Sequence, residues 1–262
     1  LSNRSDSVFT GKGLSFGGSL IRSEATGYGT VYFAEEMLKH KGRSLDGLRV
    51  SVSGSGNVAQ YSVEKAMMLG AKVVTVSDSS GTVVDEDGFT TEKLEILKDV
   101  KNNLRGRVSD YAERIKAKFI SNVRPWNIPV DVALPCATQN ELDDKDADNL
   151  IKNGVFCVAE GANMPSTAGA VKLFDKGGVL FAPGKASNAG GVATSGLEMS
   201  QNAMRLSWQS DEVDARLLEI MKAIHGSCIQ YGKRKDGSIN YVDGANIAGF
   251  VKVAEAMLGQ GV

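Results

Sequence analysis

A glycine-rich turn, Gly54-Ser55-Gly56-Asn57-Val58-Ala59, lies between a short apolar run and a stretch with helical periodicity. Its spacing matches Gly-x-Gly-x-x-Gly/Ala, in which the first glycine permits a tight turn and the second lets the backbone approach a pyrophosphate. The N–H groups that open the following helix would face those phosphates. The spacing alone is a weak signal, but a strand before it and a helix and second strand after it supply the required context. We therefore predict a dinucleotide site at Gly54, Ser55, Gly56, Asn57 and Val58.

An acidic residue follows the turn at the distance that suits an adenosine ribose. Asp78 lies at the carboxyl end of the second predicted strand, where a carboxylate accepts hydrogen bonds from ribose hydroxyls and favours NAD. Ser79 and Ser80 could instead donate to a 2′-phosphate, and Lys101 and Arg107 could reach the same place. Basic residues on a solvated helix are the commoner explanation for the last two. These residues alone leave the choice between NAD and NADP open.

Polar or glycine-rich segments also follow three later apolar runs, at 135–140, 160–163 and 183–191. Ligands of open α/β sheets bind outside the carboxyl ends of the strands, so three such ends indicate one crevice. Any single segment is equally well explained as an ordinary polar loop.

Two residues in these segments carry reactive groups. Lys185 is the best candidate for a general acid or base, although a surface lysine is equally compatible with its position. Cys136 has no histidine nearby and is expected to be buried rather than nucleophilic. A P-loop is excluded because Val179 and Ala186 stand where a glycine and a hydroxyl residue are needed.

The order of elements that would position these residues is strand, helix, strand, followed by a second such alternation and then helices. Strands are predicted at 49–53, 72–77, 130–134, 155–159 and 179–182, and helices at 26–40, 58–69, 91–102, 109–118, 145–152, 167–176, 192–208, 212–232 and 245–259. Short, almost continuously apolar strands that alternate with helices predict a parallel sheet covered on both faces. The fold class is α/β, a Rossmann-type doubly wound, mostly parallel sheet with additional C-terminal helices.

Composition excludes several other classes of protein. The chain has 262 residues with 30 basic and 31 acidic side chains, so charge gives no reason to expect a nucleic acid or a membrane surface as partner. Three scattered cysteines and two histidines make neither a disulfide framework nor a metal site, and no metal is expected. The absence of a long apolar run and of a signal pattern in these residues predicts a cytoplasmic protein.

Several motifs together match a known family. They are TGKG (10–13), GGSLIR (17–22), EATGYG (24–29) and the segments 53–59, 133–140, 159–165 and 184–201. From about Val8 to its end the chain resembles the glutamate dehydrogenases, most closely the bacterial hexameric type that prefers NADP. The resemblance implies reversible oxidative deamination of L-glutamate to 2-oxoglutarate and ammonia.

The resemblance also implies roles for individual residues. Those at the nicotinamide end and pyrophosphate of the cofactor are Thr26, Asn57, Ala137, Thr138, Asn163 and Asn188. Those around the adenosine ribose are Asp78, Ser79, Lys101 and Arg107, the last two indicating a 2′-phosphate and hence NADP in preference to NAD. Those on the substrate side are Thr10, Val192 and Ser195, the last binding the distal carboxylate.

The resemblance covers only the cofactor half of that family. It implies that residues 1–20 are a linker from an N-terminal substrate domain, that 21–262 form the dinucleotide-binding domain, and that a helix near 240–262 packs on the other domain. The catalytic lysines and aspartate belong to that other domain, so no residue here is assigned a catalytic role and the chain alone is expected to bind cofactor without turnover.

Other functions remain open from the sequence. One is an amino-acid dehydrogenase for leucine, valine or phenylalanine, which the hydroxyl of Ser195 disfavours. A non-catalytic dinucleotide-binding module is another, and a methyltransferase is a remote one.

Overall fold

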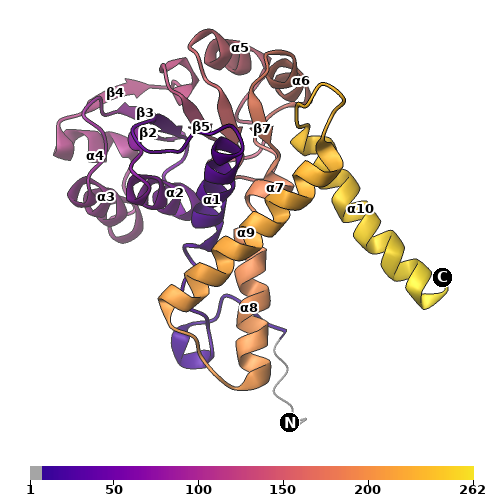
Figure 1. Ribbon diagram of the computed structural model, residues 1–262. Coiled ribbons are helices and arrows are strands. Elements are labelled where there is room, and N and C mark those ends of the chain that lie inside the picture. Colours follow the sequence, from indigo (N-terminus) through magenta and orange to yellow (C-terminus); the bar gives the residue numbers. More distant parts are fainter. Residues whose placement is uncertain (1–7) are drawn as a thin grey trace.

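In the computed structural model, which describes residues 8–262, a single mixed sheet of seven strands has the order β4-β3-β2-β1-β5-β6-β7 (Figure 1). The strands are β1 (Arg49–Val52), β2 (Lys72–Asp78), β3 (Gly81–Val84), β4 (Lys118–Ser121), β5 (Val132–Leu134), β6 (Cys157–Ala159) and β7 (Leu180–Ala182). Strands β2, β1, β5, β6 and β7 are parallel, whereas β3 and β4 pair antiparallel at one edge. The chain leaves β1 in one direction and later returns to its other side as β5, which creates the crevice where doubly wound sheets bind ligands. The predicted fold class is confirmed.

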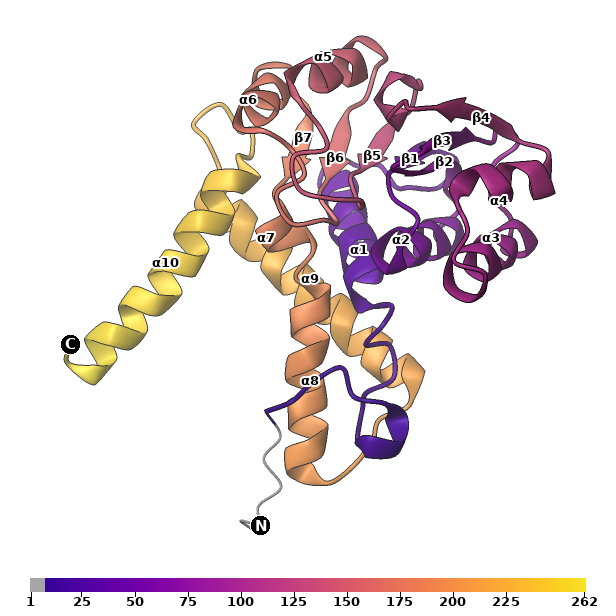
Figure 2. The same ribbon diagram turned by 180° about the vertical axis from the view of Figure 1, so that it is seen from behind.

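Helices cover both faces of the sheet. They are α1 (Ala25–Lys39), α2 (Asn57–Met68), α3 (Thr91–Lys98), α4 (Val108–Ile115), α5 (Asp144–Lys152), α6 (Ala168–Lys176), α7 (Gly184–Ser187), α8 (Gly190–Met204), α9 (Ser210–Gly232) and α10 (Tyr241–Gln260), with short turns η1 (Leu14–Phe16), η2 (Asp99–Asn103) and η3 (Pro125–Asn127). Seen from behind, α5 and α6 lie on one side of the sheet and α1 to α4 on the other (Figure 2).

Two hydrophobic clusters explain why the strands read as continuous apolar runs. Val132 and Leu134 of β5 point into the larger cluster, which includes α1 and α2, whereas Ala133 between them points into the smaller one beneath α5 and α6. On β2, Val73 and Val74 divide in the same way. Because successive side chains of a strand point to opposite faces, a strand covered on both faces has no solvent-facing position and is mostly apolar, the buried Ser51 and Thr75 being hydrogen-bonded to each other.

The sequence-based elements needed correction at the antiparallel edge. The helix predicted over 109–118 ends at Ile115, because Lys116 adopts a left-handed conformation with φ of 56°, and Lys118 already begins β4. Strands β3 and β4 were not predicted. The helix predicted over 91–102 changes after Lys98 to the π-helical η2, and the helix predicted to reach residue 208 ends at Met204.

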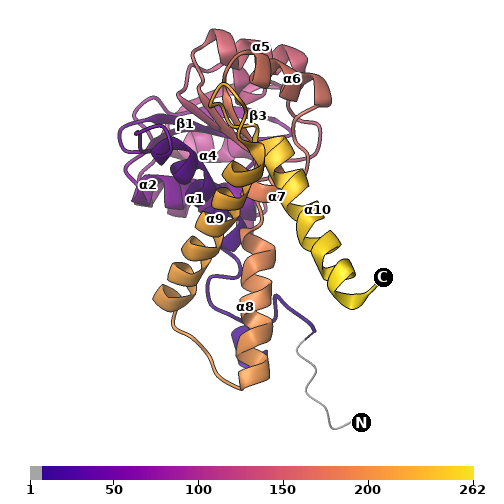
Figure 3. The same ribbon diagram turned by 45° about the vertical axis from the view of Figure 1, so that its right-hand side comes forward.

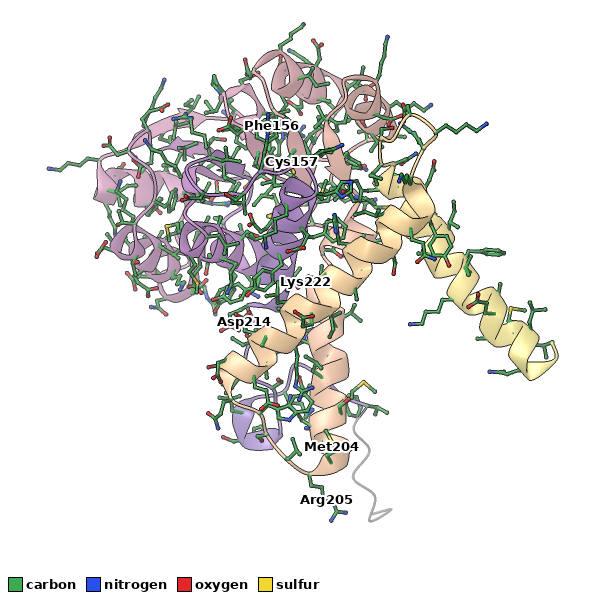
Figure 4. All side chains as sticks on the ribbon, viewed as in Figure 1. Phe156, Cys157, Met204, Arg205, Asp214 and Lys222 are labelled. Carbon is green, nitrogen blue, oxygen red and sulfur yellow. The ribbon has the colours of Figure 1, made fainter. Side chains whose placement is uncertain are left out.

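Two projections leave the α/β core. Helix α8, the first half of α9 and the segment that begins at residue 8 form an arm below the sheet, with Met204 and Arg205 at its far end (Figure 4). Asp214 of α9 ties this arm to the core by accepting hydrogen bonds from Tyr32 at 2.8 Å and Lys65 at 3.1 Å. Helix α10 diverges from the arm (Figure 3). Residues 1–7, part of the predicted linker, lie outside the described residues.

Helix α10 has an apolar face that no other element of residues 8–262 covers. Its exposed members are Ile247, Phe250, Val253, Met257 and Leu258. Among residues 8–262, none of the helices combines the length and the apolar character that crossing a bilayer requires.

The two histidines, distant in sequence, meet where α9 and α10 join the core. His225 is 6% exposed, its Nε2 lies 3.1 Å from Tyr241 Oη, and its ring is 6.3 Å from that of His40. Burial lowers the pKa of His225 to about 4; Glu36 opposes this shift and His40 adds to it. The imidazole is therefore neutral in the folded protein over a range in which an unfolded chain is protonated.

We expect acid to destabilise the protein through His225. Between pH 6.5 and pH 4 the imidazole of His225 binds a proton in the unfolded state but not in the folded state. The free energy of unfolding therefore falls as pH falls through this window. A loss of about 2 kcal/mol is expected, allowing for residual hydration of the ring. Urea unfolding of the wild type and of His225→Phe across this window measures it. The contribution of His225 is refuted if both proteins lose stability with the same slope.

Candidate functional site

The glycine turn packs tightly on one side and is open on the other. Gly54 has φ of 83°, and a Cβ there would lie 2.9 Å from the carbonyl oxygen of Cys136. Its N–H donates to Ser77 Oγ of β2 at 2.9 Å. A Cβ at Gly56 would meet nothing within 4 Å, and no side chain caps the start of α2. The turn therefore presents free backbone N–H groups to open space, as a pyrophosphate requires.

Two adjoining cavities run along the carboxyl edge of the sheet from this turn. One of about 670 Å³ extends over β2 toward Asp78 and Ser79, and one of about 710 Å³ extends over β6 and α8 toward Asn163 and Ser195. Both are lined by Val58, Cys136, Ala137 and Thr138. An elongated ligand that fills both must therefore cross the bend after β5.

Of the four predicted ribose residues, Asp78 and Ser79 line the first cavity, whereas Lys101 and Arg107 are not among its lining residues and are joined to it only through these two. Asp78 Oδ1 accepts hydrogen bonds from Ser80 N at 2.8 Å and Ser80 Oγ at 2.5 Å, while Oδ2 accepts from Val108 N at 3.0 Å and Lys101 Nζ at 3.3 Å. Four donors occupy the acceptor sites of one carboxylate. Burial would raise the pKa of Asp78, but these hydrogen bonds outweigh it and hold the pKa below its usual value.

Ser79 and Arg107 lie on the outer side of this carboxylate. Arg107 Nη1 donates to Ser79 Oγ at 2.8 Å, and both side chains are exposed. Lys101 Nζ also donates to the carbonyl of Gly106 at 2.9 Å, which keeps the amine next to the start of α4. The four residues predicted around the ribose, Asp78, Ser79, Lys101 and Arg107, are thus brought together.

The second cavity contains most residues predicted at the nicotinamide and substrate end. Thr26, Ala137, Thr138, Asn163, Asn188, Val192 and Ser195 all line it. Asn188 Nδ2 donates to Asn163 Oδ1 at 2.9 Å, joining the loop after β6 to the end of α7. Asn57, predicted at the pyrophosphate, lines the first cavity and donates from its side chain to the carbonyl of Ser23 at 2.6 Å, whereas Thr10 is not among the residues that line either cavity.

Arg22 is a site residue that the sequence analysis left without a role. It lines the second cavity, and its Nε donates to Ser195 Oγ at 2.9 Å. The two residues are 173 positions apart, so no local pattern joins them. The sequence feature that could have indicated Arg22 is its place at the end of the GGSLIR motif, three residues before the first residue of α1.

Of the two reactive groups considered from the sequence, Lys185 lines neither cavity, whereas Cys136 lines both. Lys185 Nζ donates to Asn246 Oδ1 of α10 at 2.6 Å. Cys136 is buried, as expected, and burial raises the pKa of its thiol to about 12. Within residues 8–262, no cluster of three or more His, Cys, Asp or Glu side chains has the arrangement of a metal site.

Two buried carboxylates stand under the strand ends instead. Glu160 accepts hydrogen bonds from Gly184 N at 2.7 Å and Ser166 N at 3.2 Å, so it joins the loops after β6 and β7. Glu141 occupies the corresponding place between β1 and β5. Burial raises the pKa of both groups, and the hydrogen bonds they accept oppose that effect. Sequence reasoning assigned neither residue a role.

The strand order, the glycine turn and the cleft along the carboxyl edge define a Rossmann-type α/β protein. A family model described as Glutamate/Leucine/Phenylalanine/Valine dehydrogenase matches residues 17–261, and the chain belongs to this family. The resemblance seen in the motifs is confirmed.

Individual relatives refine this placement. The chain is 65% identical over 262 residues to the NADP-specific glutamate dehydrogenase of Escherichia coli and 54% identical over 256 residues to the NAD-specific enzyme of Bacteroides fragilis. These matches cover 100% and 97% of this chain, but only 58% of the length of each relative. The structure of glutamate dehydrogenase 2 from Plasmodium falciparum superimposes with a TM-score of 0.96 at 50% identity, covering 99% of this chain and 57% of that one.

Proposed function

We propose that this chain is the cofactor-binding domain of an NADP-linked glutamate dehydrogenase, which interconverts L-glutamate with 2-oxoglutarate and ammonia. The observation that carries the proposal is the pair of adjoining cavities that run from Asp78 and Ser79 to Ser195 across the glycine turn, with Arg107 hydrogen-bonded to Ser79 at the outer end. It has a basic, hydroxyl-bearing end for a phosphorylated ribose and an amide-rich end for the nicotinamide. When bound there, NADP supplies hydride acceptance or donation at its ring, while the chain binds and orients it.

The preference for NADP is proposed from the state of Asp78. Its carboxylate is occupied by Ser80, Val108 and Lys101, so it has little capacity left to accept from a ribose diol. We assign it instead the task of holding Lys101 and the first turn of α4 in place. The guanidinium of Arg107 and the hydroxyl of Ser79 can then both donate to a group at the 2′ position, which suits a dianionic phosphate.

The choice of substrate is proposed from the opposite end. Arg22 and Ser195 are hydrogen-bonded to each other beside Val192, and a guanidinium with a hydroxyl binds a carboxylate in preference to an apolar side chain. This arrangement favours glutamate over leucine, valine or phenylalanine. Thr10 is proposed to contact substrate from the segment that precedes α1.

The remaining parts of the proposal concern the longer relatives. Residues 1–20 are proposed as a linker, 21–262 as the dinucleotide-binding domain, and the exposed face of α10 as the surface that packs on an N-terminal substrate domain. That domain would supply the catalytic lysines and aspartate. A cytoplasmic homohexamer is proposed because the resembled enzymes have that form.

A titration of the 262-residue chain with both reduced cofactors tests the proposal. We expect NADPH to bind at least about tenfold more tightly than NADH, since one charge-assisted phosphate contact contributes at least this much. We expect no glutamate-dependent reduction of NADP⁺, because the substrate-activating groups lie outside these residues. Equal affinities, or tighter NADH binding, would overturn the cofactor assignment. Robust turnover would overturn the proposal that the catalytic groups belong to another domain. A chain that bound neither dinucleotide would overturn the function itself.

A further inference from the structure

A buried carboxylate, Glu141, lies under the bend that both cavities share. The residue is 5% exposed and lies after β5. Its Oε1 accepts hydrogen bonds from Ser53 Oγ at 2.8 Å and from Ala137 N at 2.9 Å. Its own main chain is fixed by Trp126, whose indole N–H donates to the carbonyl of Glu141 at 3.2 Å.

These contacts join the glycine turn to the bend. Ser53 directly precedes Gly54, and its Oγ accepts from Cys136 N at 2.9 Å while it donates to Glu141. The amide of Ala137 therefore donates to Glu141 directly, and the amide of Cys136 is linked to the same carboxylate through the hydroxyl of Ser53. The bend is held so close to the turn that a Cβ on Gly54 would lie 3.0 Å from Ala137 Cα.

We propose that Glu141 is a positioning residue for the dinucleotide: it fixes the Cys136–Thr138 bend against the glycine turn so that one ligand can follow both cavities. This inference rests on the proposed function. It follows from the shared lining, because a dinucleotide that crosses from the pyrophosphate to the nicotinamide end passes over Ala137 and Thr138.

The charge on Glu141 is the property that matters. Hydrogen bonds to an ionised acceptor in a buried site are stronger than those to a neutral one, so a carboxylate holds a backbone bend more firmly than an amide does. Burial raises the pKa of Glu141 above its usual value, and the hydrogen bonds from Ala137, Ser53 and Thr138 and the charge of Arg124 oppose that rise by favouring the ionised form. The neighbouring thiol of Cys136 is neutral, because burial raises its pKa to about 12.

The test compares two ligands on Glu141→Gln, which keeps the length of the side chain and removes its charge. We expect the Kd of NADPH, measured by fluorescence titration, to rise about tenfold, the equivalent of one charge-assisted hydrogen bond. Adenosine 2′,5′-bisphosphate lacks the nicotinamide half and does not cross the bend, so, although Glu141 also lines the first cavity, its Kd is expected to rise by less than about threefold. A merely structural role would weaken both ligands together or neither.

Glu35→Gln is the matched control. Glu35 is also a buried carboxylate that accepts from a backbone N–H, that of Leu45 at 2.8 Å, but it lies in α1 away from both cavities. Its substitution should leave the Kd of NADPH within about twofold of wild type. If Glu141→Gln does not fold, Ser53→Ala removes one donor of the same network and should raise the Kd of NADPH about threefold to fivefold.

The outcomes separate the two proposals. Failure of the wild type to bind NADPH overturns the proposed function. Wild-type binding with an unchanged Kd in Glu141→Gln or, if that variant does not fold, in Ser53→Ala overturns the role of Glu141. Equal weakening of NADPH and adenosine 2′,5′-bisphosphate also overturns it.

Discussion

Replacing Lys101 and Arg107 together by alanine is expected to weaken NADPH binding about a hundredfold and to leave NADH binding within about twofold of the wild-type value. Arg107 donates to Ser79 at 2.8 Å, and Lys101 donates to the adjacent residue, Asp78, at 3.3 Å. A 2′-phosphate would replace Ser79 as the partner of Arg107 and gain a second cation in Lys101. NADH has no group at that position, so it loses nothing.

The size of this effect follows from the type of contact. A hydrogen bond between charged groups contributes roughly 1.5–3 kcal/mol, and about 2.7 kcal/mol corresponds to a hundredfold change in Kd. Exposure of Arg107 to solvent reduces its share. Added salt should therefore weaken NADPH binding in the wild type more than in the double variant.

Arg114→Ala is the control for loss of charge. Arg114 lies in α4, the helix that starts directly after Arg107, but its guanidinium pairs with Asp99 at 3.0 Å and not with either of the lining residues Asp78 and Ser79. Its removal should change neither Kd by more than about twofold. If the double substitution raised the Kd of NADPH and of NADH equally, Lys101 and Arg107 would support the fold rather than bind the 2′-phosphate.

The parallel half of the sheet was predictable because its signal is local. Strands such as β5 and β6 are buried on both faces, and each is followed by a helix, so apolar runs and periodicity suffice to find them. The antiparallel edge gives no such signal. Strand β4 is half-exposed, and its first residue, Lys118, falls at the end of the helix predicted over 109–118. Its register with β3 is fixed by pairing Gly81 with Ser121, which only the folded chain brings together.

The site shows the same division between local and distant information. The glycine turn could be predicted because turn, strand and helix are contiguous. The hydrogen bonds that occupy the Asp78 carboxylate could not be predicted, since one donor is Val108, thirty positions later. Its N–H is free to donate only because α4 begins there. The same holds for Arg22 and Ser195, and for Glu141 and Ser53, whose partnerships connect strands and helices far apart in the chain.

Backbone contact between α1 and α8 sets the position of the substrate end of the cleft, and we expect Gly190→Ala to disrupt it. A Cβ at Gly190 would lie 2.1 Å from the carbonyl oxygen of Ala25 and 3.0 Å from Gly29 Cα, while a Cβ at Gly29 would lie 2.8 Å from Gly190 Cα. The two glycines thus let the helices cross with their main chains in contact. Neither obstructing group is a flexible side chain, so a helix must move.

The expected cost of Gly190→Ala is about 3 kcal/mol, the upper part of the range for an overpacked core, and about 6–10 °C in Tm for a domain of this size. Gly196→Ala in the same helix is the matched control: a Cβ there meets nothing within 4 Å, so the change should stabilise the protein by about 0.5–1 kcal/mol through the backbone entropy of the unfolded chain. Thermal unfolding of the two variants therefore gives shifts of opposite sign. A Gly190→Ala protein as stable as wild type would mean that α8 can move away from α1 without loss. Because α8 carries Val192 and Ser195, such freedom would in turn remove the fixed geometry on which substrate selection at this end of the cleft depends.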